Sequence, residues 1–299
     1  MSPALLLMLI LPPMLWGSNA IVGQLAAGSI PPVTLNTLRW SVALALLAPF
    51  AISRIAPHAV TLRRHWKFLL LSGFLGITSY NALQYMALTT SSALNVSLIG
   101  AATPVFILLS GRIVFGQPIS RLSAAGAFIS LVGVACVLVR GEIGRINSIS
   151  FVAGDLFMLT AALAWSLYTL VIKRQSPKLP VVVLMAAQIG TGVLLSLPLV
   201  AMEHAWGDYA PIDWGWRELA IVFYVGTMPS LVAYFCWQRA VAKTSAQLPI
   251  FFMNLTPLFT VGMSALMLGE VPQAFHYVGL ILILGGIYLA NCAIQGKRR

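Results

Sequence analysis

Long apolar runs without a charged residue are the feature that most constrains this chain. A helix needs about 20 apolar residues to cross a hydrocarbon core roughly 30 Å thick. The 299-residue sequence has only 8% Asp, Glu, Lys and Arg, whereas a soluble domain carries roughly 25%. The runs are too continuously apolar for barrel strands, which alternate over about ten residues. We therefore expect an all-α integral membrane protein with ten transmembrane helices, at residues 3–24, 32–52, 67–87, 92–111, 121–140, 152–172, 180–201, 218–240, 245–268 and 274–294.

The connections between these runs are short. The two longest cover residues 53–66 and 202–217, which leaves no room for a water-soluble domain. Whatever the chain does must therefore take place within or between the helices.

The charged residues predict how the chain is threaded. The net charge is +11, and most cations fall in alternate connections. By the positive-inside rule these connections are cytoplasmic, as are both termini, which an even number of helices requires. The excess of positive charge therefore reports orientation and does not predict nucleic-acid binding. The cations of this set are Arg54, Arg63, Arg64, Lys67, Arg112, Arg121, Lys173, Arg174, Lys178, Arg239, Lys243, Lys297, Arg298 and Arg299. The opposite side holds Arg140, Arg145, Arg217 and all seven acids.

The sequence also repeats itself. A shift of 149 places Trp16 on Trp165, and a shift of 153 places Thr103-Pro104 on Thr256-Pro257. The second shift also superimposes several glycines. Matched Trp, Gly and Thr-Pro residues are harder to explain by chance than matched Leu or Ala. We expect two repeats, residues 1–145 and 146–299, each with five helices.

A repeat with an odd number of helices enters the membrane from opposite sides in its two copies. Such inverted repeats provide two nearly equivalent packings, one open to each side, which is the basis of alternating access in transporters. The alternative is an old duplication that is retained for fold stability alone.

Several short motifs resemble one family. They are Leu38-Arg39-Trp40, Thr103-Pro104-Val105-Phe106 and Leu268-Gly269-Glu270-Val271-Pro272. With the two five-helix units they resemble the EamA type of drug/metabolite transporter over roughly residues 10–292. Within that family the chain is most similar to bacterial exporters of aromatic and other neutral amino acids. The resemblance implies a multi-pass protein of the bacterial inner membrane that moves a small molecule, as a monomer or weak homodimer in the lipid bilayer.

Arg39 is essentially the one charge deep inside a predicted span. An ionisable group there is costly unless it is paired or hydrated, which makes it a functional candidate. It can attract a substrate carboxylate, or it can have a structural role, in which it extends outward to the membrane surface or donates hydrogen bonds to helix-end carbonyls of a neighbour. The structural role is favoured.

With so little buried charge, selectivity has to come from neutral polar groups and aromatic rings. A polar side chain that faces lipid leaves its hydrogen bonds unmade, so these residues are expected to face inward. An aromatic wall can hold an apolar side chain by offset stacking. The alternative is that they pack helices or form an interfacial belt. The candidates for substrate binding are Trp16, Asn19, Tyr80, Gln84, Asn95, Trp165, Tyr168, Tyr234, Trp237 and Asn254.

Proline identifies the expected hinges. Pro104 and Pro257 occupy matched positions, and proline within a helix removes a hydrogen bond and kinks the chain. We expect a symmetric pair of gating kinks, although a tolerated kink with a packing role is an open alternative.

An intramembrane enzyme is the main rival function, and its chemistry is missing. The sequence contains no HExxH motif, no pair of aspartates in a span and no phosphate-binding loop. We expect no enzyme activity, no cofactor and no metal. The predicted function is secondary export of amino acids or similar small metabolites, with export of drugs or another metabolite as the alternative.

Overall fold

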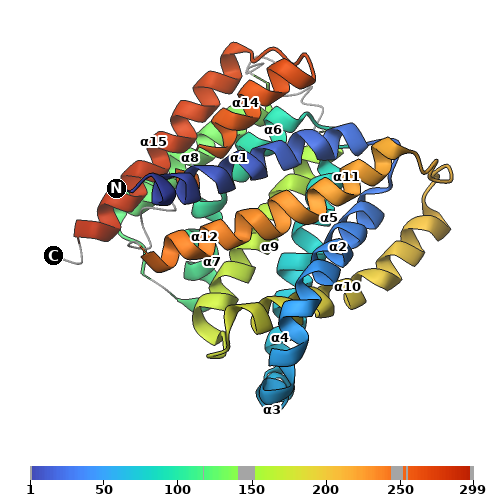
Figure 1. The fold of residues 1–299 in the computed structure, drawn as a ribbon. Helices are drawn as coiled ribbons and strands as arrows, with labels where there is room; N and C mark the ends of the chain where they lie inside the picture. The colour runs from blue at the N-terminus through green and yellow to red at the C-terminus, as the bar shows by residue number, and fades with distance from the viewer. Residues whose placement is uncertain (1, 117, 141–151, 244–251, 254, 297–299) are drawn as a thin grey trace.

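The computed structural model describes residues 2–116, 118–140, 152–243, 252–253 and 255–296. These residues are helical with short connections, and none of them forms a strand (Figure 1). The helices of the first half are α1 (Pro3–Ala26), α2 (Pro32–Ile55), the short 3-10 helix η1 (Ala56–His58), α3 (Ala59–Arg64), α4 (Trp66–Ser72), η2 (Gly73–Ser79), α5 (Tyr80–Ala87), α6 (Ala93–Ala101), α7 (Thr103–Phe115) and α8 (Arg121–Leu138). Those of the second half are α9 (Ala153–Gln175), α10 (Val181–Trp206), α11 (Trp216–Thr227), η4 (Met228–Val232), α12 (Ala233–Lys243), α14 (Thr256–Met267) and α15 (Ala274–Gly296).

Six of these helices are long and apolar enough to cross a membrane, and a seventh crossing results if the bent pair α6 and α7 is one span. Two shorter apolar helices, Thr256–Met267 and Ala274–Leu289, complete this set within the described residues. The protein is therefore a multi-pass membrane protein. The predicted number of ten spans, and the predicted boundary between residues 145 and 146, stay predictions.

Local sequence explains where several helices begin. Ser2, Ser92 and Ser120 are the N-cap residues of α1, α6 and α8, and each hydroxyl accepts a backbone N–H three residues later. The first N–H groups of α2 are instead bound by a carboxylate from the other half of the chain. Glu203 of α10 accepts hydrogen bonds from the amides of Val33 and Thr34, both at 2.8 Å.

Helix packing relates the two halves of the chain. The repeat makes α9 the counterpart of α1, α10 of α2, α12 of α5, α14 of α7 and α15 of α8. Helix α1 packs on α12 and α14, and α9 packs correspondingly on α5 and α7. The counterparts α2 and α10 pack on each other, as do α8 and α15. These are the pairings that a pseudo-twofold relation between the halves requires. Helix α1 begins and α15 ends on the same side of the bundle, at the left of Figure 1.

Glycines allow α8 and α15 to touch backbone to backbone. A Cβ at Gly133 would meet the carbonyl oxygen of Gly279 at 2.8 Å, and a Cβ at Gly286 would collide with the carbonyl oxygen of Gly126. Because the residue numbers rise on one helix as they fall on the other, the two helices are antiparallel. Small residues of this kind bring membrane helices into close contact, as the matched glycines predict.

Two π-helical segments occupy matched positions, a feature that the sequence analysis did not anticipate. They are η2 and η4, and the shift of 153 places Leu75–Ser79 on Met228–Val232. A π-helical turn changes the register of a helix and often accompanies a functional site. Asn36 of α2 donates to the carbonyl oxygens of Ile77 and Thr78 within η2, both at 3.1 Å.

The matched Thr-Pro pairs each begin a helical segment. Thr103 and Thr256 are the first residues of α7 and α14, and α7 is bent by 43° from α6 at the break at Ala102. Proline fits the first turn of a helix because no partner is needed there for its missing N–H. A hinge at Pro104 and Pro257 stays a prediction. Each segment is followed by a glycine with positive φ, Gly116 at 63° and Gly269 at 67°.

The α8–α15 contact predicts unequal effects at two adjacent glycines. Gly286→Val places a side chain against the backbone of α8, and overpacking of this kind costs about 1–3 kcal/mol. Gly285→Val is the matched control, because a Cβ at Gly285 meets nothing within 4 Å. We expect thermal unfolding in detergent to begin several degrees lower for Gly286→Val and near the wild-type temperature for Gly285→Val. Equal unfolding temperatures would contradict the close packing.

Candidate functional site

A cavity of about 130 Å³ lies between the two halves of the bundle. Its walls come from α2, η2, α9, α10 and α12. We define the acidic end of the bundle as the end at which α1 ends and α2 begins, and the basic end as that at which α9 ends and α10 begins. The cavity is lined by Trp40, Ile77, Tyr168, Ile172, Val181, Leu184, Met185, Gln188, Ile189 and Tyr234.

Two buried donors in the cavity wall have no partner. The indole Nε1 of Trp40 and the amide Nε2 of Gln188 make no hydrogen bond with any described residue. Trp40 is 1% and Gln188 4% exposed. A buried donor without a partner costs about 1–3 kcal/mol. Two such donors on one cavity are therefore suited to a ligand that brings acceptor oxygens.

Aromatic rings form two clusters that meet at the cavity. In the first, Trp16 contacts Tyr234 and Trp237, with ring centroids 5.8 and 5.7 Å apart, and Tyr234 contacts Trp40 at 6.0 Å. Because Tyr234 and Trp40 also line the cavity, this cluster connects α1, α2 and α12 to it.

The second cluster comes from α5 and α9. Trp165 lies 4.7 Å from Tyr80 and 5.1 Å from Tyr168, measured between ring centroids. Tyr168 extends this cluster into the cavity. Six of the ten predicted binding residues therefore belong to aromatic clusters with a member on the cavity wall.

Arg39 is the centre of a buried polar network beside the cavity. Its Nε donates to Ser230 Oγ at 2.6 Å, and its Nη1 donates to Asn19 Oδ1, Asn81 Oδ1 and Tyr85 OH at 3.1, 2.8 and 3.0 Å. Its guanidinium also lies 5.1 Å from the ring centre of its neighbour Trp40. These acceptors are side chains and not the helix-end carbonyls expected for a structural role, and at 1% exposure the side chain does not extend out to the membrane surface.

The partners of Arg39 are all neutral. No described acid forms an ion pair with it, and its Nη2 donates to none of the described side chains. A positive charge thus remains inside the bundle next to the cavity, where its field acts over a longer range than in water.

The other predicted polar residues lie away from the cavity wall. Asn19 Nδ2 donates to Gln84 Oε1 at 3.2 Å, so both belong to the Arg39 network. Asn95 Oδ1 lies 3.1 Å from His276 Nε2, which carries the proton because His276 Nδ1 accepts from a backbone amide. Asn254 lies outside the described residues.

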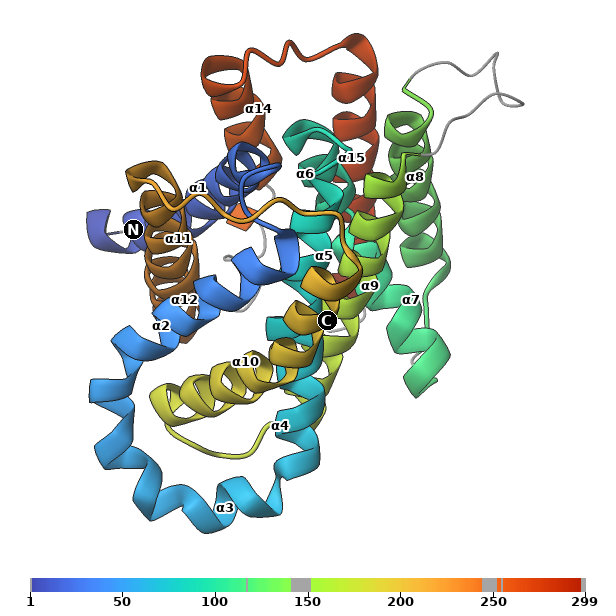
Figure 2. The same ribbon diagram turned by 90° about the vertical axis from the view of Figure 1, so that its right-hand side faces the viewer.

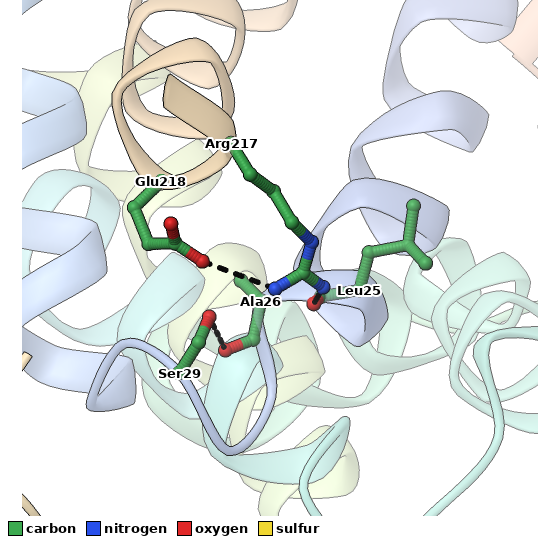
Figure 3. A network of polar contacts seen from close by, with 5 residues as sticks. All are labelled: Leu25, Ala26, Ser29, Arg217 and Glu218. Atoms are coloured by element: carbon green, nitrogen blue, oxygen red, sulfur yellow. Dashed lines mark hydrogen bonds and ion pairs between the residues drawn. The ribbon is translucent and has the colours of Figure 1, made fainter. Parts of the chain in front are cut away.

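Hydrogen bonds close the acidic end of the bundle across the two halves. Gln24 of α1 donates to Glu270 at 2.9 Å, and Ser91 donates to Asp155 at 2.5 Å. Figure 3 shows Arg217 of α11 reaching from its ion pair with Glu218, at 3.0 Å, to the Leu25 carbonyl at the end of α1. Between residues that the structure describes, no hydrogen bond joins the two halves at the basic end. Among the described residues, the hydrogen bonds that join the halves therefore include a group at the acidic end, whereas at the basic end the Arg174 guanidinium lies 4.1 Å from the centre of the Phe115 ring.

Sequence reasoning missed Trp40 and Gln188 as members of the site. Trp40 was noted only within a family motif. The repeat places Gln188 opposite Arg39, and that register is the signal with which Gln188 could have been found. The lack of a partner for either donor depends on all the neighbouring helices and is not visible in the sequence.

Comparison with known proteins identifies relatives over almost the whole chain. The model of the EamA-like transporter family matches residues 3–139 and 152–292, which confirms the resemblance seen in the motifs. A transporter from Archaeoglobus fulgidus, whose activity is uncharacterised, is 26% identical over 95% of this chain and 96% of its own. A protein from Streptantibioticus cattleyicolor, named a probable terminal-alkyne amino-acid exporter, is 28% identical over 87% of this chain and 82% of its own.

A crystal structure shares the fold. It superimposes with a TM-score of 0.64 at 21% identity and covers 98% of both chains.

The Arg39 network predicts a stability difference between two neighbouring hydroxyls. Ser230→Ala removes an acceptor of the buried guanidinium, and a hydrogen bond to a charged group contributes about 1.5–3 kcal/mol. Thr227→Ala is the control, because Thr227 only bonds to carbonyls of its own helix. We expect a clearly lower unfolding temperature for Ser230→Ala alone. Equal losses would indicate that Arg39 does not depend on η4.

Proposed function

We propose that this chain, which belongs to the EamA-like transporter family, is a secondary transporter. Its proposed substrates are amino acids with aromatic or other neutral side chains, or similar small metabolites. In this proposal the molecule has ten spans in two inverted halves, lies in the bacterial inner membrane with both ends of the chain in the cytoplasm, and exports its substrate by alternating access.

The observation that carries the proposed substrate class is the pairing of unpartnered donors with aromatic walls. Trp40 Nε1 and Gln188 Nε2 are available to the oxygens of a carboxylate. Tyr168 and Tyr234 on the same cavity are available to an apolar side chain. Aromatic contacts of this kind add about 0.5–1.5 kcal/mol each beyond area burial. A molecule with one carboxylate and an aromatic or apolar body satisfies both features.

Arg39 supports the same substrate class at longer range. Its charge is held by neutral groups, so a carboxylate in the cavity would be the nearest compensating charge. In this proposal the positive charge of Arg39 attracts the carboxylate of the substrate. If the carboxylate comes close enough, Nη2 donates a hydrogen bond to it. The amino-acid exporter among the relatives agrees with this choice.

Transport requires that the cavity opens to each side in turn. The hydrogen bonds at the acidic end correspond to a state closed there, and the basic end lacks equivalent bonds between described residues. If the basic end is cytoplasmic, as the positive-inside rule predicts, this is the state that receives substrate from the cytoplasm. Bending at Pro104 and Pro257 is the proposed hinge motion.

Export of a drug or another metabolite is the second candidate within the family. A lipophilic cation would find aromatic faces in the cavity but would be repelled by Arg39. An enzyme function is less supported, because the family model that matches the chain is that of a transporter family.

The substrate class is tested with purified protein in liposomes. We expect flux of radiolabelled phenylalanine that other aromatic and neutral amino acids inhibit. Phenethylamine, which lacks the carboxylate, should inhibit poorly. Movement of lipophilic cations alone would refute the amino-acid hypothesis. Flux that persists without a pH gradient is expected from the absence of an acid in the first span.

Trp40→Phe and Gln188→Met are expected to raise KM for the amino acid about tenfold or more each. Each change removes one donor to a charged acceptor, a loss of about 1.5–3 kcal/mol. The maximal rate should change less than KM. Trp206→Phe and Gln175→Met are matched controls, because both side chains are exposed. A KM that stays constant in both cavity variants would remove these donors from the binding site.

Weakening the acidic end should open it. We expect Gln24→Ala combined with Glu203→Ala to increase labelling of a single cysteine at position 22 several-fold when intact cells are treated with an impermeant maleimide. Thr89→Ala is the control, since Thr89 lies at the same end and bonds only to the Met86 carbonyl. The native cysteines are replaced by serine throughout. Unchanged labelling would show that these bonds do not hold the end closed.

A further inference from the structure

A second, larger hollow lies beside the cavity and faces outward. It has a volume of about 330 Å³ and is bounded by α2, α10, η4 and α12. Figure 2 shows the ribbons of α2 and α12 and the start of α10 at the left of the view. The walls of the hollow are entirely apolar, and three lining side chains are at least half exposed: Phe50 at 66%, Phe235 at 55% and Val181 at 50%. We call it the lateral groove. Its lining residues are Leu46, Leu47, Phe50, Val181, Val182, Met185, Leu231, Val232 and Phe235.

One end of the lateral groove is positively charged. Arg54 lies four residues beyond Phe50 on α2, and Arg239 lies four residues beyond Phe235 on α12. Lys178 precedes Val181 by three residues at the start of α10. Residues four apart on one helix, such as Phe50 and Arg54 or Phe235 and Arg239, lie on one face about one turn or 6 Å apart along the axis, whereas Lys178 lies in the connection that leads into α10. All three cations lie toward the basic end and are exposed.

Arg239 lies directly at the rim of the groove. Its guanidinium carbon lies 4.6 Å from the centre of the Phe235 ring, which is part of the groove wall. The sequences of these elements contain no acid that could neutralise the cations, since residues 32–66, 176–202 and 219–243 include no Asp or Glu.

We propose that the lateral groove binds an anionic phospholipid. One acyl chain fills the apolar part between α2, α10 and α12, and the phosphate lies among Arg54, Lys178 and Arg239. An acyl chain is the hydrocarbon available to an apolar groove on the membrane-facing surface, and an anionic headgroup at the bilayer surface matches the cations. A zwitterionic lipid fills the apolar part equally well but offers the cations no net charge.

The lipid would also complete the wall of the cavity. Val181 and Met185 line both the lateral groove and the cavity. A chain seated in the groove therefore packs on the outer side of residues whose inner side faces the cavity.

The proposal is tested by thermal unfolding of the full-length protein in detergent with added lipid. A ligand that binds only the folded state raises the unfolding temperature. We expect dioleoylphosphatidylglycerol to raise it by several degrees, at least threefold more than dioleoylphosphatidylcholine. Inorganic phosphate and glycerol phosphate should have no effect. Equal shifts for the two lipids, or a shift with phosphate alone, would overturn the proposal.

Two variants separate the charged and apolar parts of the site. In Arg54→Gln/Lys178→Gln/Arg239→Gln, the advantage of phosphatidylglycerol over phosphatidylcholine should disappear. Val182→Trp fills the groove and should reduce the shift caused by either lipid. The control Arg112→Gln/Arg121→Gln/Lys173→Gln removes three other exposed cations and should keep the wild-type response. Loss of the response in this control would attribute it to net charge and contradict the site.

A measurement on the wild-type protein does not depend on how the variants fold. Phosphatidylglycerol with a photoreactive diazirine on one acyl chain should label peptides of α2, α10 and α12 in excess over other membrane-facing helices. Labelling distributed evenly over all helices would overturn the proposal. The unfolding and labelling experiments do not measure transport, so their results are independent of the proposed function.

Discussion

The bilayer requires every polar group of this chain to find its partner inside the protein, and the structure follows from that requirement. Where the backbone departs from regular helix at η2, the side chain of Asn36 binds the carbonyls of Ile77 and Thr78. At η4, the carbonyl of Pro229 accepts the indole N–H of Trp16 at 3.1 Å. Irregular backbone at membrane depth is tolerated only where protein or a cavity surrounds it. The two π-helical segments thus lie at the centre of the bundle, beside Arg39 and the aromatic clusters.

Buried donors without a hydrogen-bond partner are therefore the feature that indicates a candidate binding site. Most buried polar side chains in the described bundle bind another side chain or a backbone carbonyl, and of the few atoms that do not, the donors of Trp40 and Gln188 lie on residues that line the cavity. A buried donor without a partner costs free energy in a medium without water, and this is the reason why the cavity is the candidate site. In the part of the chain that the structure describes, hydrogen bonds join the two halves at the acidic end and not at the basic end.

Sequence reasoning reached the family, the helical class and the repeat, because these depend on residue type and spacing. Trp16, Trp165, Tyr168 and Tyr234 belong to the clusters that meet at the cavity. Sequence reasoning did not predict which partner each polar residue binds. Asn95 binds His276 near the acidic end, and Asn19 serves Arg39. An amide at mid-helix looks the same in the sequence whether it faces a ligand or another side chain.

The sequence by itself determined that the chain is a multi-pass helical protein with two related halves, since apolar runs, matched glycines and matched Thr-Pro pairs are properties of local composition and register. Only the tertiary structure decided which donors stay unpaired, where the lateral groove lies, and where hydrogen bonds between described residues join the two halves. The physical reason is that hydrogen-bond satisfaction and cavity shape are set by contacts between helices far apart in the chain, such as α2 with α10 and η4, and no local pattern encodes the sum of those contacts.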